Sequence, residues 1–257
     1  MNLSLLFDAP SLVLVLSSLL IGFVVGGRNV YKSLNLSKAI SIPLGACGTL
    51  IGLSLMLIDL EDPSVIGPAI TVAALPSIYG LLLSIVLDAI VSRINSPVEA
   101  SSNQLIQVKT IGGCLLVVAI PIVISILYAN PTVFIDVYAI VIVLIGAPSL
   151  TFLAAQTIEK RIEALGKYSL LISLFAVLCS IALLFTQWHD PTLIGPTMAI
   201  GLLSLLYGGI LYTLSQVMHH SLYEKALSFS VQGNSVYLAS TIFVGGSLFL
   251  MIMYSFA

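Results

Sequence analysis

Residues 48–83 and residues 176–211 are two versions of one sequence, GTLIGLSLMLIDLEDPSVIGPAITVAALPSIYGLLL and AVLCSIALLFTQWHDPTLIGPTMAIGLLSLLYGGIL. Seven residues recur 128 positions later: Asp62, Pro63, Ile66, Gly67, Pro68, Tyr79 and Gly80 return as Asp190, Pro191, Ile194, Gly195, Pro196, Tyr207 and Gly208. The same spacing relates Asp8 to Asp136, which lie outside both stretches. The chain therefore repeats itself at a fixed interval.

Two copies of this interval account for nearly all of the 257 residues. We predict a tandem duplication, with a first four-helix repeat at residues 1–129 and a second, degenerate four-helix repeat at residues 130–257.

The composition is that of a membrane protein. Hydrophobic residues make up 59% of the chain, charged residues only 8%, and the mean hydropathy is +1.15. A soluble domain has about a quarter of its residues charged. Apolar runs long enough, or nearly so, to cross a hydrocarbon core of about 30 Å as helices occur eight times. These runs are residues 10–27, 39–59, 66–91, 107–128, 133–155, 168–188, 193–217 and 236–256. We predict an all-α membrane protein with eight transmembrane helices.

The basic residues set the expected orientation. All nine lie on one side of the eight spans, at Arg28, Lys32, Lys38, Arg93, Lys109, Lys160, Arg161, Lys167 and Lys225. The positive-inside tendency makes this side cytoplasmic. The opposite loops hold Asp8, Asp59, Glu61, Asp62, Asp136 and Asp190. We expect both termini on the outer, periplasmic side. Because four spans per copy is an even number, the copies are expected to be parallel repeats.

Local signals indicate how the helices start and pack. Gly48 and Gly52 form a small-xxx-small pattern that lets a second helix approach closely. Asp62 before Pro63, and Asp190 before Pro191, are typical of a turn followed by a capped helix start. Further expectations are a cap at Asp8, a helix start near Ser37 and a kink in the helix that contains Pro68 and Pro76.

Several function classes have no support in the sequence. Cys47, Cys114 and Cys179 all lie within expected spans, so no extracellular disulfide framework is implied. There is no nucleotide-binding loop, nucleophile motif, zinc-ligand spacing or basic nucleic-acid patch. Two adjacent histidines, His219 and His220, point in different directions on a helix, so interfacial solvation is expected rather than metal binding. We expect no enzymatic activity, no metal site and no bound cofactor.

The stretch from Gly48 to Leu83 resembles the third and fourth helices of the MotA/TolQ/ExbB family of ion-channel subunits, and its motif DPSVIGP…YG is most similar to the MotA/PomA flagellar-stator branch. The runs that follow Asp8 and Asp136 resemble the family's second helix, and the spans with paired glycines, Gly112-Gly113 and Gly245-Gly246, resemble its first. The resemblance implies that each half holds the family helices in the order two, three, four, one. The stator branch also has a large cytoplasmic domain between helices two and three, where this chain has only short connections.

The resemblance implies an ion pathway at Thr49 and Ser77. Family members carry a Thr on helix three and a Thr on helix four that form a polar ring, and these two residues match those positions. Their spacing from Asp62 places both hydroxyls roughly 20 Å below the outer turn at 1.5 Å per residue. Such hydroxyls can replace water around a cation, although Ser and Thr in membrane helices often only bond their own i−4 carbonyl.

The second copy has lost both hydroxyls. Its equivalents of Thr49 and Ser77 are Val177 and Leu205, with Ser204 beside the latter. The second repeat is therefore predicted to be a structural partner. Tyr79 with Gly80, and Tyr207 with Gly208, retain a family position and are expected to mediate close helix packing.

The resemblance also implies a partner and an assembly. Family subunits work with a single-helix MotB, TolR or ExbD type protein that supplies an intramembrane Asp, and this chain has no Asp or Glu at mid-membrane. Asp88, the nearest, is expected to be solvated at the interface or paired with a base. The translocated ion would be H⁺ or Na⁺, in a bacterial inner membrane. Family rings hold five units around two partner helices, so either five chains use only their first copy or three chains form a pseudo-six ring.

Two other functions are compatible with the residues. A non-conducting scaffold or accessory subunit of a flagellar or envelope complex is favoured by the degenerate second copy and the missing cytoplasmic domain. A small-solute transporter is the third alternative, although the expected parallel repeats differ from the inverted repeats common among such carriers.

Overall fold

The computed structural model describes residues 7–27, 29–57, 63–94, 103–128, 131–186, 193–223 and 230–255. Within these ranges the chain is helical, without strands. Its α-helices are α1 (Ala9–Gly26), α2 (Val30–Met56), α3 (Pro63–Val91), α4 (Asn103–Tyr128), α5 (Val137–Ile140), α6 (Gly146–Ala154), α7 (Ile158–Thr186), α8 (Ile194–Tyr223) and α9 (Ser230–Ser255). A 3₁₀ turn, Pro131–Phe134, precedes α5, and a π-helical turn, Val141–Ile145, joins α5 to α6.

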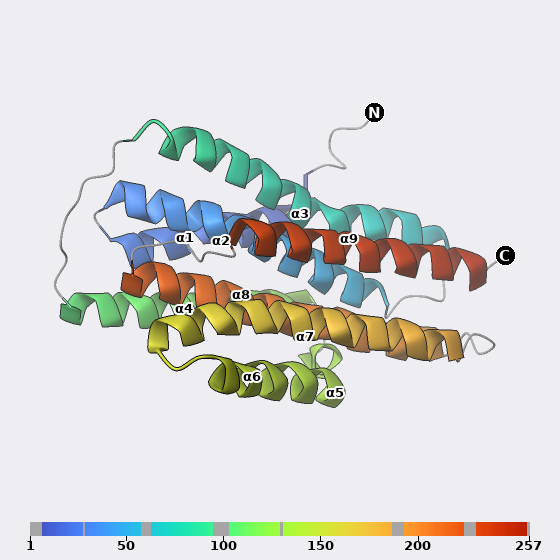
Figure 1. Ribbon diagram of the computed structural model, residues 1–257. Helices are drawn as coiled ribbons and strands as arrows, with labels where there is room; N and C mark the ends of the chain where they lie inside the picture. The colour runs from blue at the N-terminus through green and yellow to red at the C-terminus, as the bar shows by residue number, and fades with distance from the viewer. Residues whose placement is uncertain are drawn as a thin grey trace.

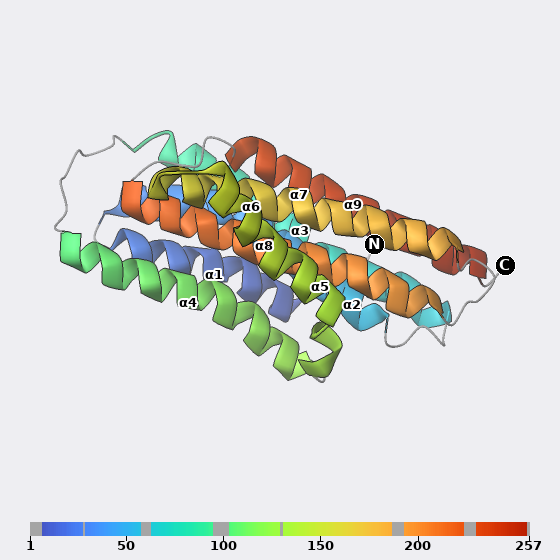
Figure 2. The same cartoon turned by 60° about the horizontal axis from the view of Figure 1, so that its bottom comes forward.

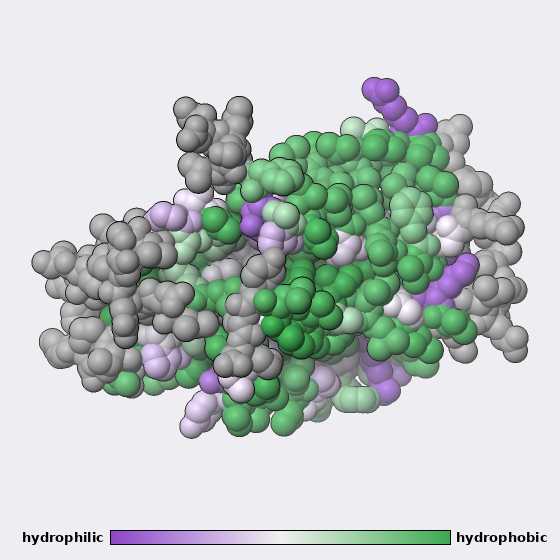
Figure 3. Space-filling model, turned by 180° about the vertical axis from the view of Figure 1, so that it is seen from behind, coloured by the Kyte–Doolittle hydropathy of each residue, from purple (hydrophilic) through white to green (hydrophobic). Residues whose placement is uncertain are grey.

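The described helices confirm an all-α, multi-pass membrane protein. Seven segments in the described ranges are long and apolar enough to cross a membrane: Ala9–Gly26, Val30–Met56, Ile66–Val91, Val108–Leu127, Val137–Ala154, Ile158–Thr186 and Ile194–Tyr223. The eighth expected span, 236–256, falls on α9. Figure 3 shows one face of the molecule, where hydrophobic residues cover the middle and hydrophilic residues gather toward the two ends. This distribution suits a slab of hydrocarbon between two aqueous sides.

Four long helices form a row in the order α3, α2, α8, α7 (Figure 1). The flanking helices α3 and α7 do not share a substantial contact with one another among the described residues. On one side of this row lie α1, α4 and the α5–α6 segment (Figure 2). On the other side lies α9, which packs against α2, α8 and α7. The row thus brings helices of both predicted repeats into one layer.

The helix bounds follow the spacing of the two sequence copies. Ala9 and Val137, which begin α1 and α5, are 128 positions apart, and so are Gly26 and Ala154, which end α1 and α6. The first residue of α7 likewise stands 128 positions after the first residue of α2. The division at residue 129 remains a prediction, and the bounds of the other helices depart from the spacing of 128 by a few residues.

The fifth expected span, 133–155, is not one regular helix. Its helix begins at α5 and widens into the π turn before α6. Pro148 provides the physical reason, because it has no N–H to donate to the Leu144 carbonyl and its ring crowds that carbonyl. The first-copy position of Pro148 is Leu20, and α1 is an unbroken α-helix there.

Two expected helix starts can be compared with the caps in the structure. The carboxylate of Asp8 accepts a hydrogen bond from the Ser11 N–H at 3.0 Å, so the predicted cap of α1 is present. The expected start of α2 near Ser37 is wrong: α2 begins at Val30, where Asn29 caps it by accepting from the Lys32 N–H. The helix continues through polar residues beyond its apolar run, and hydropathy alone does not detect that extension.

Small residues set the approach of α2 to α3. A Cβ added at Gly48 would lie 2.7 Å from the Cβ of Pro76, and one added at Gly52 would lie 2.8 Å from the Cβ of Ala73. A Cβ at Gly80 would lie 2.6 Å from the Ser41 carbonyl oxygen. Real Cβ atoms do not approach other atoms this closely, so these glycines are required by the packing of the two helices.

The α7–α8 pair makes equivalent contacts, and in one of them the glycine lies on the other helix. Gly201 of α8 abuts Ser180 of α7, and these are the second-copy positions of Ala73 and Gly52. Gly208, the counterpart of Gly80, would place a Cβ 2.9 Å from the Ser169 carbonyl oxygen. The expected packing role of these glycines is therefore visible in their contacts.

We predict that Gly52→Val destabilises the folded protein in detergent by about 1–3 kcal/mol, because the larger side chain overpacks the contact with Ala73. The measurement is the thermal unfolding midpoint of the purified protein. The matched control is Gly246→Val on α9, where an added Cβ meets no atom within 4 Å. Equal midpoints for the two variants would contradict the packing role of Gly52.

Candidate functional site

The hydroxyls of Thr49 and Ser77 meet inside the contact between α2 and α3. The Thr49 Oγ1 and Ser77 Oγ atoms are 2.7 Å apart, and both side chains are buried, with 8% and 9% of their surface exposed. The sequence predicts that the two hydroxyls lie at one depth on adjacent helices, and in the structure they form a direct hydrogen bond. Neither hydroxyl is turned outward toward lipid.

Thr49 also bonds the backbone of α3, just after Pro76. A proline inside a helix cannot donate a backbone hydrogen bond and disturbs the turn before it. The next residue, Ser77, directs its N–H to Thr49 Oγ1 at 3.2 Å. Thr49 therefore accepts from a backbone group of the neighbouring helix, in addition to its bond with the Ser77 hydroxyl.

One of the two O–H groups of Thr49 and Ser77 has no acceptor within the pair. A hydroxyl has one O–H and can accept two hydrogen bonds. If Ser77 donates to Thr49, the Thr49 O–H is left for a third group, and if Thr49 donates, the Ser77 O–H is left. The pair can thus offer a hydrogen bond to a water molecule or to a carboxylate.

The second copy has no such pair. Val177 and Leu205, at the equivalent positions, are buried and apolar. Ser204 is fully buried, and its Oγ has no hydrogen-bond partner among the described residues. The two copies therefore keep the same helix contact but differ in its polar content.

Two tyrosines fasten the equivalent helices in each copy. Tyr79 of α3 accepts a hydrogen bond from the backbone N–H of Asp8, at the start of α1, at 3.3 Å. Tyr207 of α8 donates to the carbonyl oxygen of Phe134, just before Asp136 and the start of α5. Both hydroxyls bond across a helix interface, as the sequence analysis expected for a packing role.

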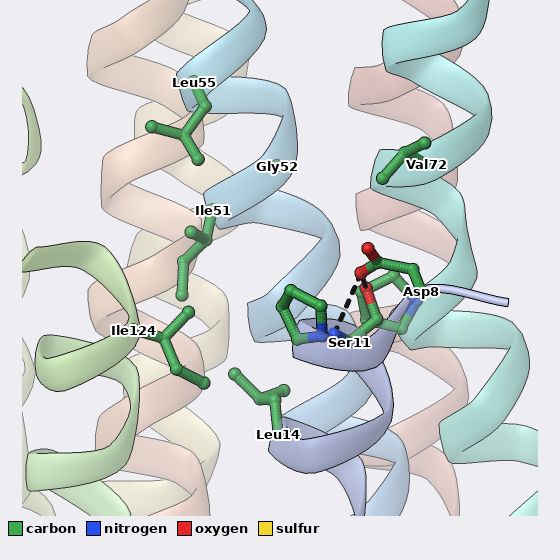
Figure 4. A pocket seen from close by; sticks show the side chains of 11 residues that line it. Asp8, Ser11, Leu14, Ile51, Gly52, Leu55, Val72 and Ile124 are labelled. Carbon is green, nitrogen blue, oxygen red and sulfur yellow. Dashed lines mark hydrogen bonds between the residues drawn. The ribbon is translucent and has the colours of Figure 1, made fainter. Parts of the chain in front are cut away.

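An apolar pocket lies beside the glycine face of α2, and Figure 4 shows it from close by. It is lined by Asp8, Pro10, Ser11, Leu14, Gly48, Ile51, Gly52, Leu55, Val72, Pro76 and Ile124. The one carboxylate in it is bonded to Ser11, as the dashed line in Figure 4 shows. Thr49 and Ser77 do not line this pocket, so it is separate from the hydroxyl pair.

The charged end of α3 holds the acid that the sequence analysis singled out. The Asp88 carboxylate accepts from Lys38 Nζ at 2.9 Å, in an ion pair whose Asp88 side chain is largely exposed. Pairing with a base was one of its two expected roles. His219 and His220 are both buried in α8, so their expected solvation at the interface is wrong. His220 Nε2 lies 3.2 Å from the Lys32 carbonyl oxygen of α2.

The predicted turn residues can be placed only in part. Pro63 is the first residue of α3. Asp62, Asp190 and Pro191 lie outside the described residues. Within the described ranges, no group of three or more His, Cys, Asp or Glu side chains is arranged to hold a metal ion.

A buried polar network on α9 was missed by the sequence analysis. Asn234 donates from its Nδ2 to the Ala39 carbonyl oxygen of α2 at 3.0 Å. Its Oδ1 accepts from Tyr212 at 2.8 Å and from Gln216 at 3.0 Å, both on α8. The Tyr237 hydroxyl donates to a carbonyl of α8, that of Leu205, at 3.1 Å. The residues of this network are 18 to 195 positions apart in the sequence, so no local sequence pattern indicates that they meet.

We predict that Asn234→Ala weakens the attachment of α9 by about 1–3 kcal/mol, since it leaves buried polar partners on α8 unsatisfied. The readout is the thermal unfolding midpoint, together with the accessibility of α9 to protease. Ser235→Ala is the matched control, because its exposed hydroxyl bonds only carbonyls of its own helix. An unchanged midpoint for Asn234→Ala would contradict the anchoring role.

Comparison with known proteins gives a match over the segment that contains the hydroxyl pair. Residues 28–107 match the model of the MotA/TolQ/ExbB proton channel family. The chain is similar to the chemotaxis protein PomA of Vibrio alginolyticus, with 51% identity over 41 residues, which is 16% of each chain. It is also similar to motility protein A of Cereibacter sphaeroides, with 52% identity over 46 residues, or 18% of each chain.

A longer match is to motility protein A of Aquifex aeolicus, with 37% identity over 67 residues, covering 26% of this chain and 25% of the relative. The chain thus matches about a quarter or less of the length of these relatives. No solved structure matches it. The resemblance noted in the sequence, including its motility branch, is confirmed for the segment that forms α2 and α3.

Proposed function

We propose that this chain, whose residues 28–107 belong to the MotA/TolQ/ExbB proton channel family, is an integral inner-membrane subunit of an ion-driven channel or stator complex. The observation that carries the proposal is the hydroxyl pair of Thr49 and Ser77, 2.7 Å apart between two adjacent membrane helices of the matched segment. H⁺ or Na⁺ is the transported ion in this proposal.

The pair acts as a polar station for the ion. Its remaining O–H can donate to a water molecule or to a carboxylate, and its oxygens can take the place of hydration water around a cation. Polar groups in hydrocarbon are costly unless satisfied, and the mutual hydrogen bond satisfies one of the two O–H groups when no ion is present.

The proposal requires a carboxylate from a second protein. Among the described residues, α2 and α3 carry no Asp or Glu near the hydroxyl pair, and Asp88 is paired with Lys38 toward one helix end. The Asp8 carboxylate lies in the neighbouring pocket, beside Gly48 and Pro76, but it is bonded to Ser11 as the cap of α1. A single-helix subunit of the MotB, TolR or ExbD type, with an Asp at mid-membrane, would supply it. Ion passage between this Asp and the hydroxyl pair would then move the partner relative to this chain.

The second repeat has a structural role in this proposal. It conserves the helix contacts through Gly201 and Gly208 but has Val177 and Leu205 at the positions of the hydroxyls. Both termini are proposed to lie in the periplasm, with the basic residues in the cytoplasm.

We predict that the double variant Thr49→Val, Ser77→Ala abolishes ion flux while leaving the fold intact, because valine retains the shape of threonine, alanine adds no bulk in place of serine, and neither carries a hydroxyl. Flux is measured in vesicles that contain the chain with its co-purified partner, by quenching of a pH-sensitive dye under an imposed potential and by Na⁺ uptake. Ser204→Ala is the matched control and leaves flux unchanged, since this buried hydroxyl has no partner among the described residues. Unaltered flux in the double variant would remove the assignment.

A non-conducting scaffold is the second candidate function. The observation in its favour is that Thr49 and Ser77 bond each other inside a closed helix contact, with no ion between them. Purification from native membranes separates the candidates: a one-span protein with an intramembrane Asp supports the channel. Absence of such a partner, together with no ion leak in reconstituted vesicles, supports the scaffold.

A further inference from the structure

An open cavity lies where α6 ends and α7 begins, a junction that can be followed in Figure 1. Its volume is about 490 Å³, whereas one water molecule occupies about 30 Å³ in the liquid, so the cavity can hold a group of several atoms. The membrane-crossing segments Val137–Ala154 and Ile158–Thr186 are joined here by residues 155–157. The cavity therefore lies close to the level at which hydrocarbon meets water.

The second repeat is open at this junction because larger residues replace small ones of the first repeat. In the first repeat α1 packs closely on α2, and a Cβ added at Gly26 would lie 2.6 Å from the backbone nitrogen of Ser33. By the spacing of 128, the counterparts of Gly26 and Ser33 are Ala154 and Arg161. The end of α6 therefore cannot approach α7 as the end of α1 approaches α2.

Arg161 holds the wall of the cavity in place. Its Nε donates to the Ala155 carbonyl oxygen at 3.0 Å, and its guanidinium carbon lies 5.1 Å from the centre of the Phe152 ring. Ala155 itself lines the cavity. The end of α6 is thus tied to the beginning of α7, and the cavity is shaped by contacts within the protein.

Four side chains of the lining carry hydrogen-bond donors that have no partner among the described residues. They are Lys160, Lys167 and Tyr168 of α7 and Gln232 of α9. Glu163, the carboxylate of this lining, already has a partner. The lining thus combines two positive charges and one negative charge with a phenol and an amide. An anion with several oxygen atoms is the ligand that these donors fit.

The two lysines can act on one ligand. They stand seven residues apart, which is two turns of α7 and about 10 Å along its axis at 1.5 Å per residue. Each ammonium ends a flexible four-carbon chain and can turn toward a group bound between them. The first-repeat counterparts of Lys160 and Lys167 are Lys32 and Ala39. The pair of lysines is therefore a property of the second repeat alone.

Large apolar side chains next to the cavity lining are turned outward. Leu153 precedes the lining residue Ala154 and is 84% exposed, and Val231 precedes Gln232 and is 81% exposed. A soluble anion would gain no contact from these side chains. A phospholipid carries its phosphate and its acyl chains in one molecule, so it can use both the cavity and the apolar side chains beside it.

We propose that this cavity binds the headgroup of an anionic phospholipid, with the phosphate between Lys160 and Lys167 and an acyl chain against Leu153. Basic pockets between membrane helices on the cytoplasmic side can bind such headgroups, and each lysine near an anionic membrane surface raises affinity about fivefold. The inference goes beyond the proposed channel and does not depend on ion conduction, because neither Thr49 nor Ser77 lines the cavity.

Native mass spectrometry of the intact chain in mild detergent tests the site, with phosphatidylglycerol as the probe. We expect one phosphatidylglycerol to bind more tightly than those that follow. The double variant Lys160→Gln, Lys167→Gln should weaken this first binding step about ten- to thirtyfold. The matched control, Arg93→Gln with Lys109→Gln, also removes two positive charges but lies outside the cavity, so it should leave the step unchanged. Equal weakening by both double variants would indicate general charge attraction and overturn the proposal.

Two competitors distinguish the possible ligands. Phosphatidylcholine has no net charge and should show no tight first step. Inorganic phosphate lacks acyl chains and should not displace phosphatidylglycerol at equal concentration. A tight step with phosphatidylcholine would assign the cavity to neutral lipid, and displacement by inorganic phosphate would assign it to a soluble anion. Either result overturns the proposal.

Two single variants keep the test decisive if the lysine double variant does not fold. Tyr168→Phe removes one hydroxyl from the lining, and Leu153→Ser removes an exposed apolar side chain without changing charge. Each should weaken the first step about two- to tenfold, through loss of a hydrogen bond or of apolar contact. An unchanged thermal unfolding midpoint verifies the fold of each variant. Unchanged lipid binding in both variants would contradict the site.

Ion flux separates this inference from the proposed function. A tight phosphatidylglycerol step in a chain that conducts no ions would leave the lipid site standing and remove the channel. Flux from a chain that shows no tight step would do the reverse.

Discussion

Close approach of helices inside a membrane is the constraint on which this structure depends. Lipid tails are as apolar as leucine side chains, so burial of apolar surface drives helix association much less than it does in water. What remains is van der Waals packing and hydrogen bonds between helices. In this chain both occur along α2, which is buried by α1, α3, α8 and α9. Its glycines admit α3, and its carbonyl groups receive bonds from α8 and α9.

The hydroxyl pair is a product of this same constraint. Gly48 and Gly52 bring the backbones of α2 and α3 together, and Thr49 lies between them in the sequence. Because the backbones are close, Thr49 can reach both the N–H and the hydroxyl of Ser77. A polar station and a tight helix contact are thus built from one short segment. The second repeat shows that the contact survives without the station.

The sequence predicted the fold class and the location of the pair for identifiable reasons. Long apolar runs indicate membrane helices almost independently of context, and counting residues from the turn gave Thr49 and Ser77 a common depth. The irregular turn before α6 was not anticipated, although Pro148 was visible, because a proline in a membrane helix can also be accommodated by a simple kink. The burial of His219 and His220 and the network of Asn234 depend on which distant helices meet. Periodicity carries no information on that choice.

The position of α9 separates the two repeats more than their sequences suggest. Its counterpart α4 packs against α1 and α8 on one side of the row, whereas α9 packs on the other side, between α2 and α8. Asn234 and Tyr237 hold it there, and α4 has Ile106 and Lys109 at the corresponding positions. The helices α4 and α9 thus have equivalent places in the two repeats but pack on opposite sides of the row, and they differ in the side chains at these two positions.

The paired contacts Gly52–Ala73 and Ser180–Gly201 carry a consequence for how such a chain can change. In each crossing one residue is glycine and the residue that faces it has a side chain. The glycine lies on α2 in the first repeat, whereas it lies on α8, the counterpart of α3, in the second. A Cβ on both helices would bring the two Cβ atoms to 2.8 Å at the Gly52–Ala73 crossing, so a side chain gained on one helix requires that the other helix give one up or move away.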